Sequence, residues 1–515
     1  MALMFPTLQP GSRRADHRML VGIAVAVGLI VATTSPATIV SAIGAVAFVL
    51  FLLHRPHWGL YFIILSVPVQ TMYSLKVGPM NFSSTEVLVI LTSLSWIGQI
   101  LLLGVTRLER APLLAPMLVL LGAIFLSFLQ AQELVLSIKE LVKWLELFMV
   151  YLLSVNLLRT RDHVAIAVLL LIIAALLQAG IGLDQFLNRQ GPASFLIRGQ
   201  FLRAYGTFDQ PNPFAGYLNL VTPLCIALFL VTVRGVSTAI LPNVAVRTEQ
   251  RAWLAATLII TAGVIASLSR GAWLALAVAT FVLAFRAGRA PWKTIGILAC
   301  LYIAVAWCAA IGLLPTSLWE SLLKSFSLAG VDTDVTHLSP ETFSAAQRLA
   351  FWTAGLNMFQ DNTWFGVGMG NYGVFYNKYA VRGWQADLAH AHDYYLNFAA
   401  ETGLIGLCAF LYFTCAVFYQ TWRPAFRLKD PLFGAIAAGA LGMFIGLCVH
   451  NVFDDLFVHG TVNVIAIILG LSAVVERLDD AASLVHPELA TGATARRATT
   501  NDETESQGVF CGKRT

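Results

Sequence analysis

The sequence predicts an all-α, polytopic membrane protein with about 14 transmembrane helices (12 possible) and one large helical extracytoplasmic loop. Of its 515 residues, 58% are hydrophobic and only 12% are charged, whereas soluble domains carry roughly 25% charged residues. The mean hydropathy is +0.74. The apolar residues form blocks about 16–24 residues long, near the length that crosses a bilayer as a helix. Alternating segments typical of barrel strands are not visible, so a helical bundle is favoured.

Fourteen apolar segments are the expected spans: 19–34, 38–53, 58–74, 85–104, 112–130, 136–157, 163–184, 213–233, 252–268, 271–285, 294–313, 394–420, 432–450 and 460–475. The basic residues are concentrated in every second connection between these segments. They form the groups Arg13/Arg14/Arg18, His54/Arg55, Arg107/Arg110, Arg159/Arg161, Arg234/Arg247/Arg251, Arg286/Arg289/Lys293, Arg423/Arg427/Lys429 and Arg477. This bias predicts that these connections and both termini are cytoplasmic. The shortest segments could be re-entrant, which would lower the number of spans.

The expected organisation follows from these spans. Its parts are a cytoplasmic N-terminus (1–18), a transmembrane bundle with short outer loops (19–313), a large extracytoplasmic loop (314–391), C-terminal transmembrane helices (392–476) and a disordered cytoplasmic tail (477–515). The large loop is too long for a simple connection. Within it, Ser339 and Pro340 are typical of a helix start, and Asp361 is expected near the end of that helix.

Composition also limits the possible partners and cofactors. The formal net charge of +5 is small, and no basic stripe with interleaved aromatic residues appears, so a nucleic-acid partner is not expected. The seven cysteines lie mostly inside apolar blocks without a CxxC pair. They are therefore interpreted as packing residues rather than as a disulfide framework or a zinc site.

The most informative stretch is residues 390–406, where a polar run passes into an apolar segment. Read as a helix, it places His392, Leu396, Ala399, Gly403 and Gly406 on one stripe, whose small residues would let a second helix approach closely. We interpret His392 as a general base at the mouth of this helix. A structural histidine is one alternative. A metal site is the other, with the ligands His390, His392 and Asp393 completed by His450, Asp454 and Asp455.

Three arginines are candidates for binding an anion. Arg203 precedes Asn212 and Pro213, a pattern that predicts a capped helix whose N-terminus would help to hold phosphate. Arg270 sits between two apolar blocks on the expected outer side, where positive charge is disfavoured, so it is a functional candidate. Arg348 lies on the expected loop helix and is a candidate only because Arg203 and Arg270 are candidates as well.

A further charged ridge lies on the expected span 136–157, formed by Lys139, Glu140, Lys143 and Glu146. Side chains of this kind near the end of a span usually extend to the interface. We therefore interpret the ridge as an interfacial feature rather than as part of the site.

Taken together, these motifs resemble the superfamily of O-antigen ligases and O-antigen polymerases. The resemblance covers about residues 130–475. It rests on Arg203-Ala-Tyr-Gly-Thr-Phe with the following Pro-Asn, Ser-Arg270-Gly-Ala-Trp, Gly366-Val-Gly-Met-Gly-Asn-Tyr, and Ala-His392-Asp-Tyr-Tyr-Leu with Glu401-Thr-Gly403-Leu-Ile-Gly406. The glycine run has no strand before it and is interpreted as a turn-rich backbone path rather than a dinucleotide site. Asp393 departs from the family pattern, in which Asn, Ser or Gln follows the histidine.

The resemblance implies a bacterial inner-membrane glycosyltransferase of the GT-C type that is inverting, independent of metals and free of cofactors. Its donor would be an undecaprenyl-pyrophosphate-linked glycan, and its acceptor a glycan or lipid A core. Arg203 and Arg270 would hold the pyrophosphate, and His392 would activate the acceptor hydroxyl. The candidate supporting residues are Arg348, His390, Asp393, Asn212, Glu401, His450 and Asp454. Membrane lipids, a chain-length regulator or a flippase are the remaining expected partners.

Three functions remain open. A polymerase of O-antigen or exopolysaccharide repeats is favoured, and a ligase that transfers the finished glycan to lipid A core or protein is the alternative. A transporter or flippase for lipid-linked glycans belongs to another class. It would predict charged residues spread through the middle of the membrane, whereas here they cluster near the expected outer face.

Overall fold

The computed structural model describes residues 36–72, 74–77, 80–104, 108–197, 201–288, 340–385, 390–458 and 460–485. The expected spans 19–34 and 294–313 lie outside these ranges, as do Ser339 and the tail beyond residue 485. Of the large loop, the structure describes the part that begins at Pro340.

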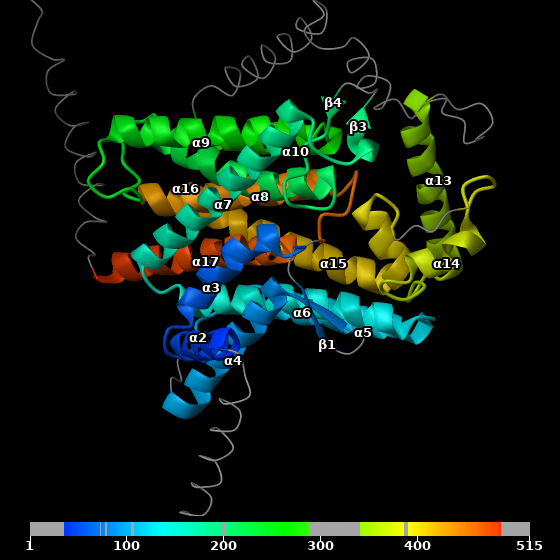
Figure 1. Cartoon of the computed structure of the whole chain (residues 1–515), viewed down its shortest axis with the longest axis horizontal. Helices are drawn as coiled ribbons and strands as arrows, with labels where there is room; N and C mark the ends of the chain where they lie inside the picture. The colour runs from blue at the N-terminus through cyan, green and yellow to red at the C-terminus, as the bar shows by residue number, and fades with distance from the viewer. Residues whose placement is uncertain are drawn as a thin grey trace, which may run out of the picture.

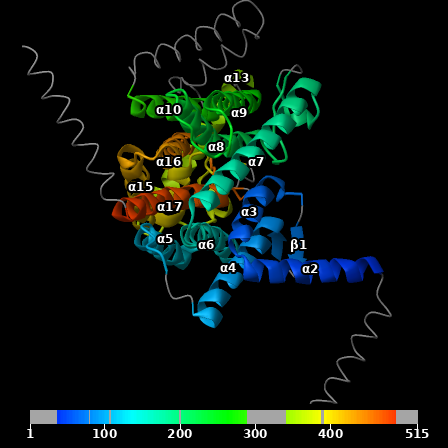
Figure 2. The same cartoon turned by 90° about the vertical axis from the view of Figure 1, so that its left-hand side faces the viewer.

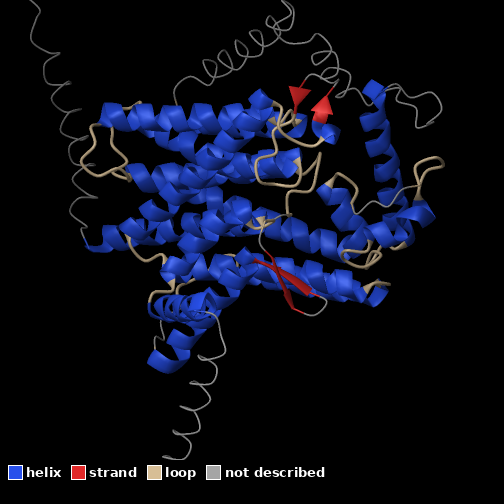
Figure 3. Cartoon of the chain, viewed as in Figure 1, coloured by secondary structure: helices blue, strands red, loops and turns tan. Residues whose placement is uncertain are grey.

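The described chain is mostly helical (Figure 3). Its helices are α2 (Pro36–His54), α3 (His57–Ser66), α4 (Ser84–Leu103), α5 (Leu114–Ser127), α6 (Leu134–Leu157), α7 (Arg161–Asn188), α8 (Pro211–Thr232), α9 (Val246–Ala266), α10 (Arg270–Arg286), α13 (Pro340–Asp361), α14 (Tyr372–Tyr379), α15 (Tyr394–Arg427), α16 (Pro431–His450) and α17 (Thr461–Val485). Two short antiparallel hairpins were not predicted from the sequence: β1 (Ser74–Val77) with β2 (Met80–Ser83), and β3 (Leu196–Ile197) with β4 (Phe201–Leu202).

Six of the described helices are long and apolar enough to cross a membrane, namely α4, α7, α8, α15, α16 and α17. This supports an integral membrane protein, while the larger number of spans stays a prediction. Helix α13 ends at Asp361, as expected. Helix α17 continues to Val485, so residues 477–485 are helical rather than part of a disordered tail.

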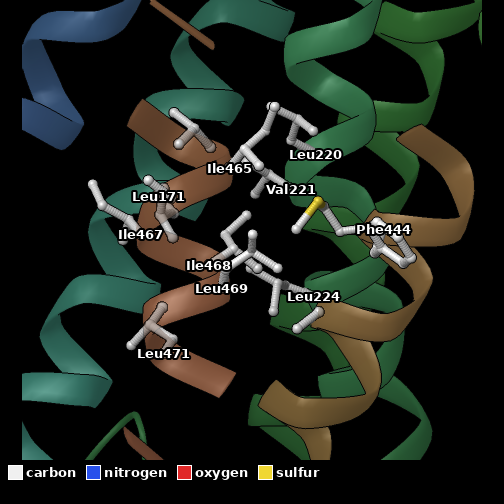
Figure 4. Packing of buried hydrophobic residues seen from close by; sticks show 14 of the residues in the cluster. Leu171, Leu220, Val221, Leu224, Phe444, Ile465, Ile467, Ile468, Leu469 and Leu471 are labelled. Atoms are coloured by element: carbon white, nitrogen blue, oxygen red, sulfur yellow. The ribbon is translucent and has the colours of Figure 1, made fainter. Parts of the chain in front are cut away.

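The centre of the bundle is formed by α8, α16 and α17. In each of them 83% of the most apolar window is buried, against 33% in α4 and 39% in α15. Figure 4 shows the packing in this region, with Leu224 of α8 next to Leu469 of α17 and with Phe444 of α16 farther to the right. The branched side chains exclude water from this region, which provides a rigid frame for the loops at its ends.

The bundle has one end where the polar elements gather. Helices α13 and α14 and the β3–β4 hairpin lie at the same end (right in Figure 1). Helices α2, α3 and α4 form a separate group beside α6 and α7 (Figure 2). Of the functional residues described below, Arg348 lies on α13 and Arg203 directly follows β4, while the others lie on the first turns of α8 and α10 and in the loops before α15 and after α16.

Helix α15 is interrupted at Gly403, whose φ of 64° and ψ of −164° are not helical. The segment that follows α13 enters this break: Val367 N donates to Ala400 O, and Leu404 N donates to Thr363 O. A Cβ at Gly403 would lie 2.4 Å from the Trp364 carbonyl carbon. The prediction that Gly403 lets a second helix approach was therefore wrong, because the close neighbour is the loop backbone.

Gly403→Ala is predicted to loosen this junction. An L-residue with this backbone conformation costs about 1–3 kcal/mol, and the contact with Trp364 adds to that cost. We expect a lower apparent Tm in detergent and faster proteolysis after residue 361. Gly180→Ala in α7 is the matched control, because its Cβ would meet nothing within 4 Å. A Gly403→Ala variant as stable as this control would contradict the prediction.

Candidate active site

His392 lies immediately before α15, not on the helix as the sequence suggested. Its φ of 55° is in the left-handed region, which is uncommon for a residue with a side chain and is often found at functional sites. Several hydrogen bonds hold this turn: Ala391 N donates to Asn397 Oδ1 (2.9 Å), and Tyr394 N donates to Asn451 O (2.8 Å). The ring stacks on Phe351 of α13, so its position is set from both sides.

Asp454 is the partner of His392. It lies in the loop between α16 and α17, is 6% exposed, and its Oδ1 is 3.2 Å from His392 Nδ1. Burial raises the pKa of Asp454, but the hydrogen bond and charge of His392, with His390 and His450, lower it below its usual range. Asp454 is therefore a carboxylate. Its contact with Nδ1 leaves the other ring nitrogen of His392, Nε2, available to accept a proton.

Arg203 approaches the same carboxylate from another direction. Its Nε donates to Ser267 O (2.8 Å), and its Nη2 donates to Asn212 Oδ1 (2.7 Å). Burial lowers the pKa of Arg203 to about 10; Asp454 opposes the shift, and Arg270 and Arg348 add to it. The guanidinium is still charged at neutral pH. Among the described residues, these two bonds use only two of its five N–H donors.

The loop that carries Arg203 is held by two glutamines of α7. Gln185 Oε1 accepts from Tyr205 N and Gly206 N, and Gln178 Oε1 accepts from Thr207 N. Both glutamines are polar residues in an apolar helix and lie two turns apart. Their spacing, which places both on one face of the helix, is a signal of this role that is present in the sequence.

Asn212 belongs to the first turn of α8 rather than capping it. The helix begins at Pro211, and its N-cap is Gln210. Since Pro211 and Pro213 have no N–H, this helix end offers fewer backbone donors for a phosphate than the sequence pattern predicted. The Asn212 side chain instead bonds outward, with Nδ2 donating to Asp454 Oδ2 (2.5 Å).

Arg270 and Arg348 complete a cluster of three arginines. Arg270 is the first residue of α10, and Arg348 lies on α13. Both are close enough to Arg203 to interact electrostatically with it, and Arg348 also interacts with Asp454. Burial lowers the pKa of Arg348, and Asp454 opposes that shift. Like charges crowded into a partly buried site are typical of a site for a multiply charged anion.

His390 raises the question of a metal. The ligand atoms of His390, His392 and Asp454 all lie within 4.8 Å of one another, a spacing that a metal ion could use. However, His390 Nδ1 accepts from His392 N (3.2 Å), and His392 Nδ1 already contacts Asp454. The three arginines nearby also disfavour an added cation. The geometry therefore favours a hydrogen-bonded His–Asp pair.

The other predicted residues have distinct places. Asp393 is the N-cap of α15, its side chain accepting from Leu396 N, which accounts for the acid beside His392. Glu401 accepts from Tyr372 N, so it holds the glycine-rich segment rather than contacting His392. His450 is buried at the end of α16 close to Asp454 and Arg348, and its Nδ1 has no partner among the described residues.

Part of the charged ridge of α6 turns toward the protein: Glu140, Lys143 and Glu146 are half-buried, whereas Lys139 is exposed as its interpretation as an interfacial feature predicts. Lys143 Nζ pairs with Glu140 Oε2 at 2.6 Å, and its side chain is only 20% exposed. It also interacts with the charge of Asp455, next to Asp454. The helical spacing of the ridge was visible in the sequence, but the loop between α16 and α17 that covers it was not.

With this geometry described, comparison with known proteins is informative. Residues 255–411 match the family model described as O-antigen ligase. This match supports the resemblance of the chain to the O-antigen ligase and polymerase superfamily. The match includes Arg270, Arg348 and His392, and it is shorter than the region 130–475 that the motifs suggested. No curated protein matches the chain. The family and the apolar helices indicate a membrane enzyme with lipid-linked glycan and membrane lipids as partners.

The depressed pKa of Asp454 leads to a stability prediction. Because the pKa is lower in the folded protein than its unfolded value of about 3.9, Asp454 stabilises the fold above that pH, and this contribution is lost as the pH falls. We expect Asp454→Asn to lower the apparent Tm at neutral pH and the difference from wild type to shrink near pH 3.5. Asp361→Asn, at an exposed position, is the control. A difference that is independent of pH would count against the charged pair.

Proposed function

We propose that the protein is an inverting glycosyltransferase that moves a glycan from an undecaprenyl-pyrophosphate donor onto an acceptor hydroxyl. The reaction takes place at the outer face of the bacterial cytoplasmic membrane, and its product is a polymer of O-antigen or exopolysaccharide repeats. The observation that carries this proposal is the contact between His392 and Asp454 within a site that also gathers Arg203, Arg270 and Arg348. A base and an anion-binding cluster are the two parts that such a transfer needs.

In this mechanism His392 is the general base. Asp454 accepts the hydrogen bond from Nδ1–H, so Nε2 takes the proton of the acceptor hydroxyl. The acceptor oxygen attacks the anomeric carbon and forms the new glycosidic bond, while the bond from that carbon to the pyrophosphate oxygen breaks. A positioned base of this kind typically contributes about 10²–10⁴-fold to the rate.

The arginines act on the leaving group. The lipid pyrophosphate departs with the electron pair of the broken bond, so it needs neutralisation of negative charge rather than a proton. Guanidinium groups bind phosphate oxygens through paired N–H donors, and in a partly buried site this interaction is strong. Attack on the side opposite the pyrophosphate inverts the anomeric centre.

The outer face is proposed from the charge pattern of the sequence. The connections rich in arginine and lysine are assigned to the cytoplasm. The ends of α7, α9 and α16 that lead to Arg203, Arg270 and Asp454 are then on the opposite side. This placement would let the lipid tail of the donor remain in the bilayer while the glycan extends outward. A chain-length regulator or a flippase would act before or after the transfer.

A ligase is the second candidate, favoured by the description of the matched family as O-antigen ligase. Both reactions use the same base and the same leaving group, and they differ only in the acceptor. A transporter is less well supported, because Arg203, Asn212, Asp454 and His392 form one connected hydrogen-bonded site.

His392→Ala is predicted to keep the fold but to lose nearly all glycan transfer, because the acceptor hydroxyl would have no base. The measurement incubates purified protein with a lipid-linked repeat, with and without lipid A core, and sizes the products. His54→Ala, an exposed position at the end of α2, is the control. A ladder of products indicates a polymerase and a single transfer a ligase; wild-type transfer by His392→Ala would make the base assignment wrong.

Transfer is also predicted to be insensitive to metal chelators, since His392 Nδ1 is engaged by Asp454 and no step needs a Lewis acid. Rates are compared before and after dialysis against EDTA. Inhibition that zinc reverses would instead assign His390, His392 and Asp454 as metal ligands.

A further inference from the structure

Asn212 lies between the two halves of the candidate site. It is on the first turn of α8, with Arg203 on one side and Asp454 on the other. Its two contacts are with groups of opposite charge. Arg203 belongs to the anion-binding cluster, whereas Asp454 belongs to the pair that orients His392.

The amide is suited to this position by its own polarity. Its Oδ1 accepts from Arg203 Nη2 at 2.7 Å, and its Nδ2 donates to Asp454 Oδ2 at 2.5 Å. An amide side chain presents an acceptor to the cation and a donor to the anion through one planar group. A carboxylate at this position would keep the contact with Arg203 but would face Asp454 with a like charge.

The amide also separates two groups that would otherwise attract each other. Arg203 and Asp454 are close enough to interact electrostatically, and both are largely buried. A direct ion pair between them would engage the guanidinium that is proposed to bind phosphate. It would also draw the carboxylate away from His392 Nδ1.

We propose that Asn212 is a positioning residue that couples donor binding to the base. It holds Asp454 against His392 and at the same time leaves Arg203 available to the donor pyrophosphate. The inference rests on the function proposed above. It adds a hydrogen-bonded connection that runs from Arg203 through Asn212 and Asp454 to His392.

The test compares Asn212→Asp with Asn212→Ala in the purified full-length protein, using a lipid-linked repeat as donor. Each substitution should raise the donor KM and lower kcat, by about 10-fold to 100-fold in kcat/KM, the range for hydrogen bonds to charged groups. Asn212→Asp should be the more severe, because its carboxylate competes with phosphate for Arg203 and repels Asp454.

A purely structural role predicts the opposite result for Asn212→Asp. An aspartate in the first turn of a helix is favoured by the helix dipole, so the variant should fold well and remain active. Wild-type kcat and KM in Asn212→Asp would therefore overturn the proposal. The control is Asn219→Ala, two turns along α8, which loses the bond from Nδ2 to Ala272 O. It should lower the apparent Tm and leave the donor KM unchanged.

The double variant Asn212→Asp with Asp454→Asn tests the connection itself. In it the carboxylate at position 212 accepts from Arg203, and the amide at position 454 donates to that carboxylate and accepts from His392 Nδ1–H. We expect about tenfold more activity than in Asn212→Asp alone. Additive losses would overturn the coupling. Wild-type transfer by His392→Ala would instead refute the proposed function, so the two failures are distinguishable.

Discussion

The site depends on one buried carboxylate. Removing Asp454 from water is costly unless opposite charges and hydrogen-bond donors surround it. The donors come from separate parts of the chain, since His392 precedes α15 and Asn212 opens α8. Satisfying this carboxylate thus brings together loops distant in sequence, and the tightly packed α8, α16 and α17 hold their ends in place.

The backbone carries a second constraint, which is local strain at the site. His392 has a left-handed conformation, and Gly403 breaks α15 about three turns later. Both deviations are supported by hydrogen bonds to neighbouring loops, from Tyr394 N to Asn451 O and from Leu404 N to Thr363 O. The described part of the large loop is thereby fixed to α15 on one side and reaches His392 through Phe351 on the other.

The residues of the site were easier to predict from the sequence than the contacts between them. Arg203, Arg270 and His392 stand out because polar groups in apolar surroundings are costly and therefore informative. Asp454 was predicted only as a possible metal ligand or supporting residue and not as the partner of His392, because the two lie 62 residues apart and no local pattern links them. Helical periodicity likewise placed His392 on one stripe with Gly403, since it shows neither the helix start at Tyr394 nor the break at Gly403. The positions of most helices were predictable from hydropathy, whereas the C-terminal ends of α3 and α17 and the long-range pairing were not.

The charge balance of the site follows the charge movement of the proposed transfer. As the acceptor loses its proton, positive charge develops on His392, and three guanidinium groups nearby would oppose it without Asp454. Negative charge develops at the same time on the pyrophosphate, where those guanidinium groups favour it. Each new charge thus arises beside a group of opposite charge. The Asn212 amide lies between Arg203 and Asp454 and keeps them from forming an ion pair before the donor binds. A site with the arginines alone would bind the donor but disfavour the protonated base.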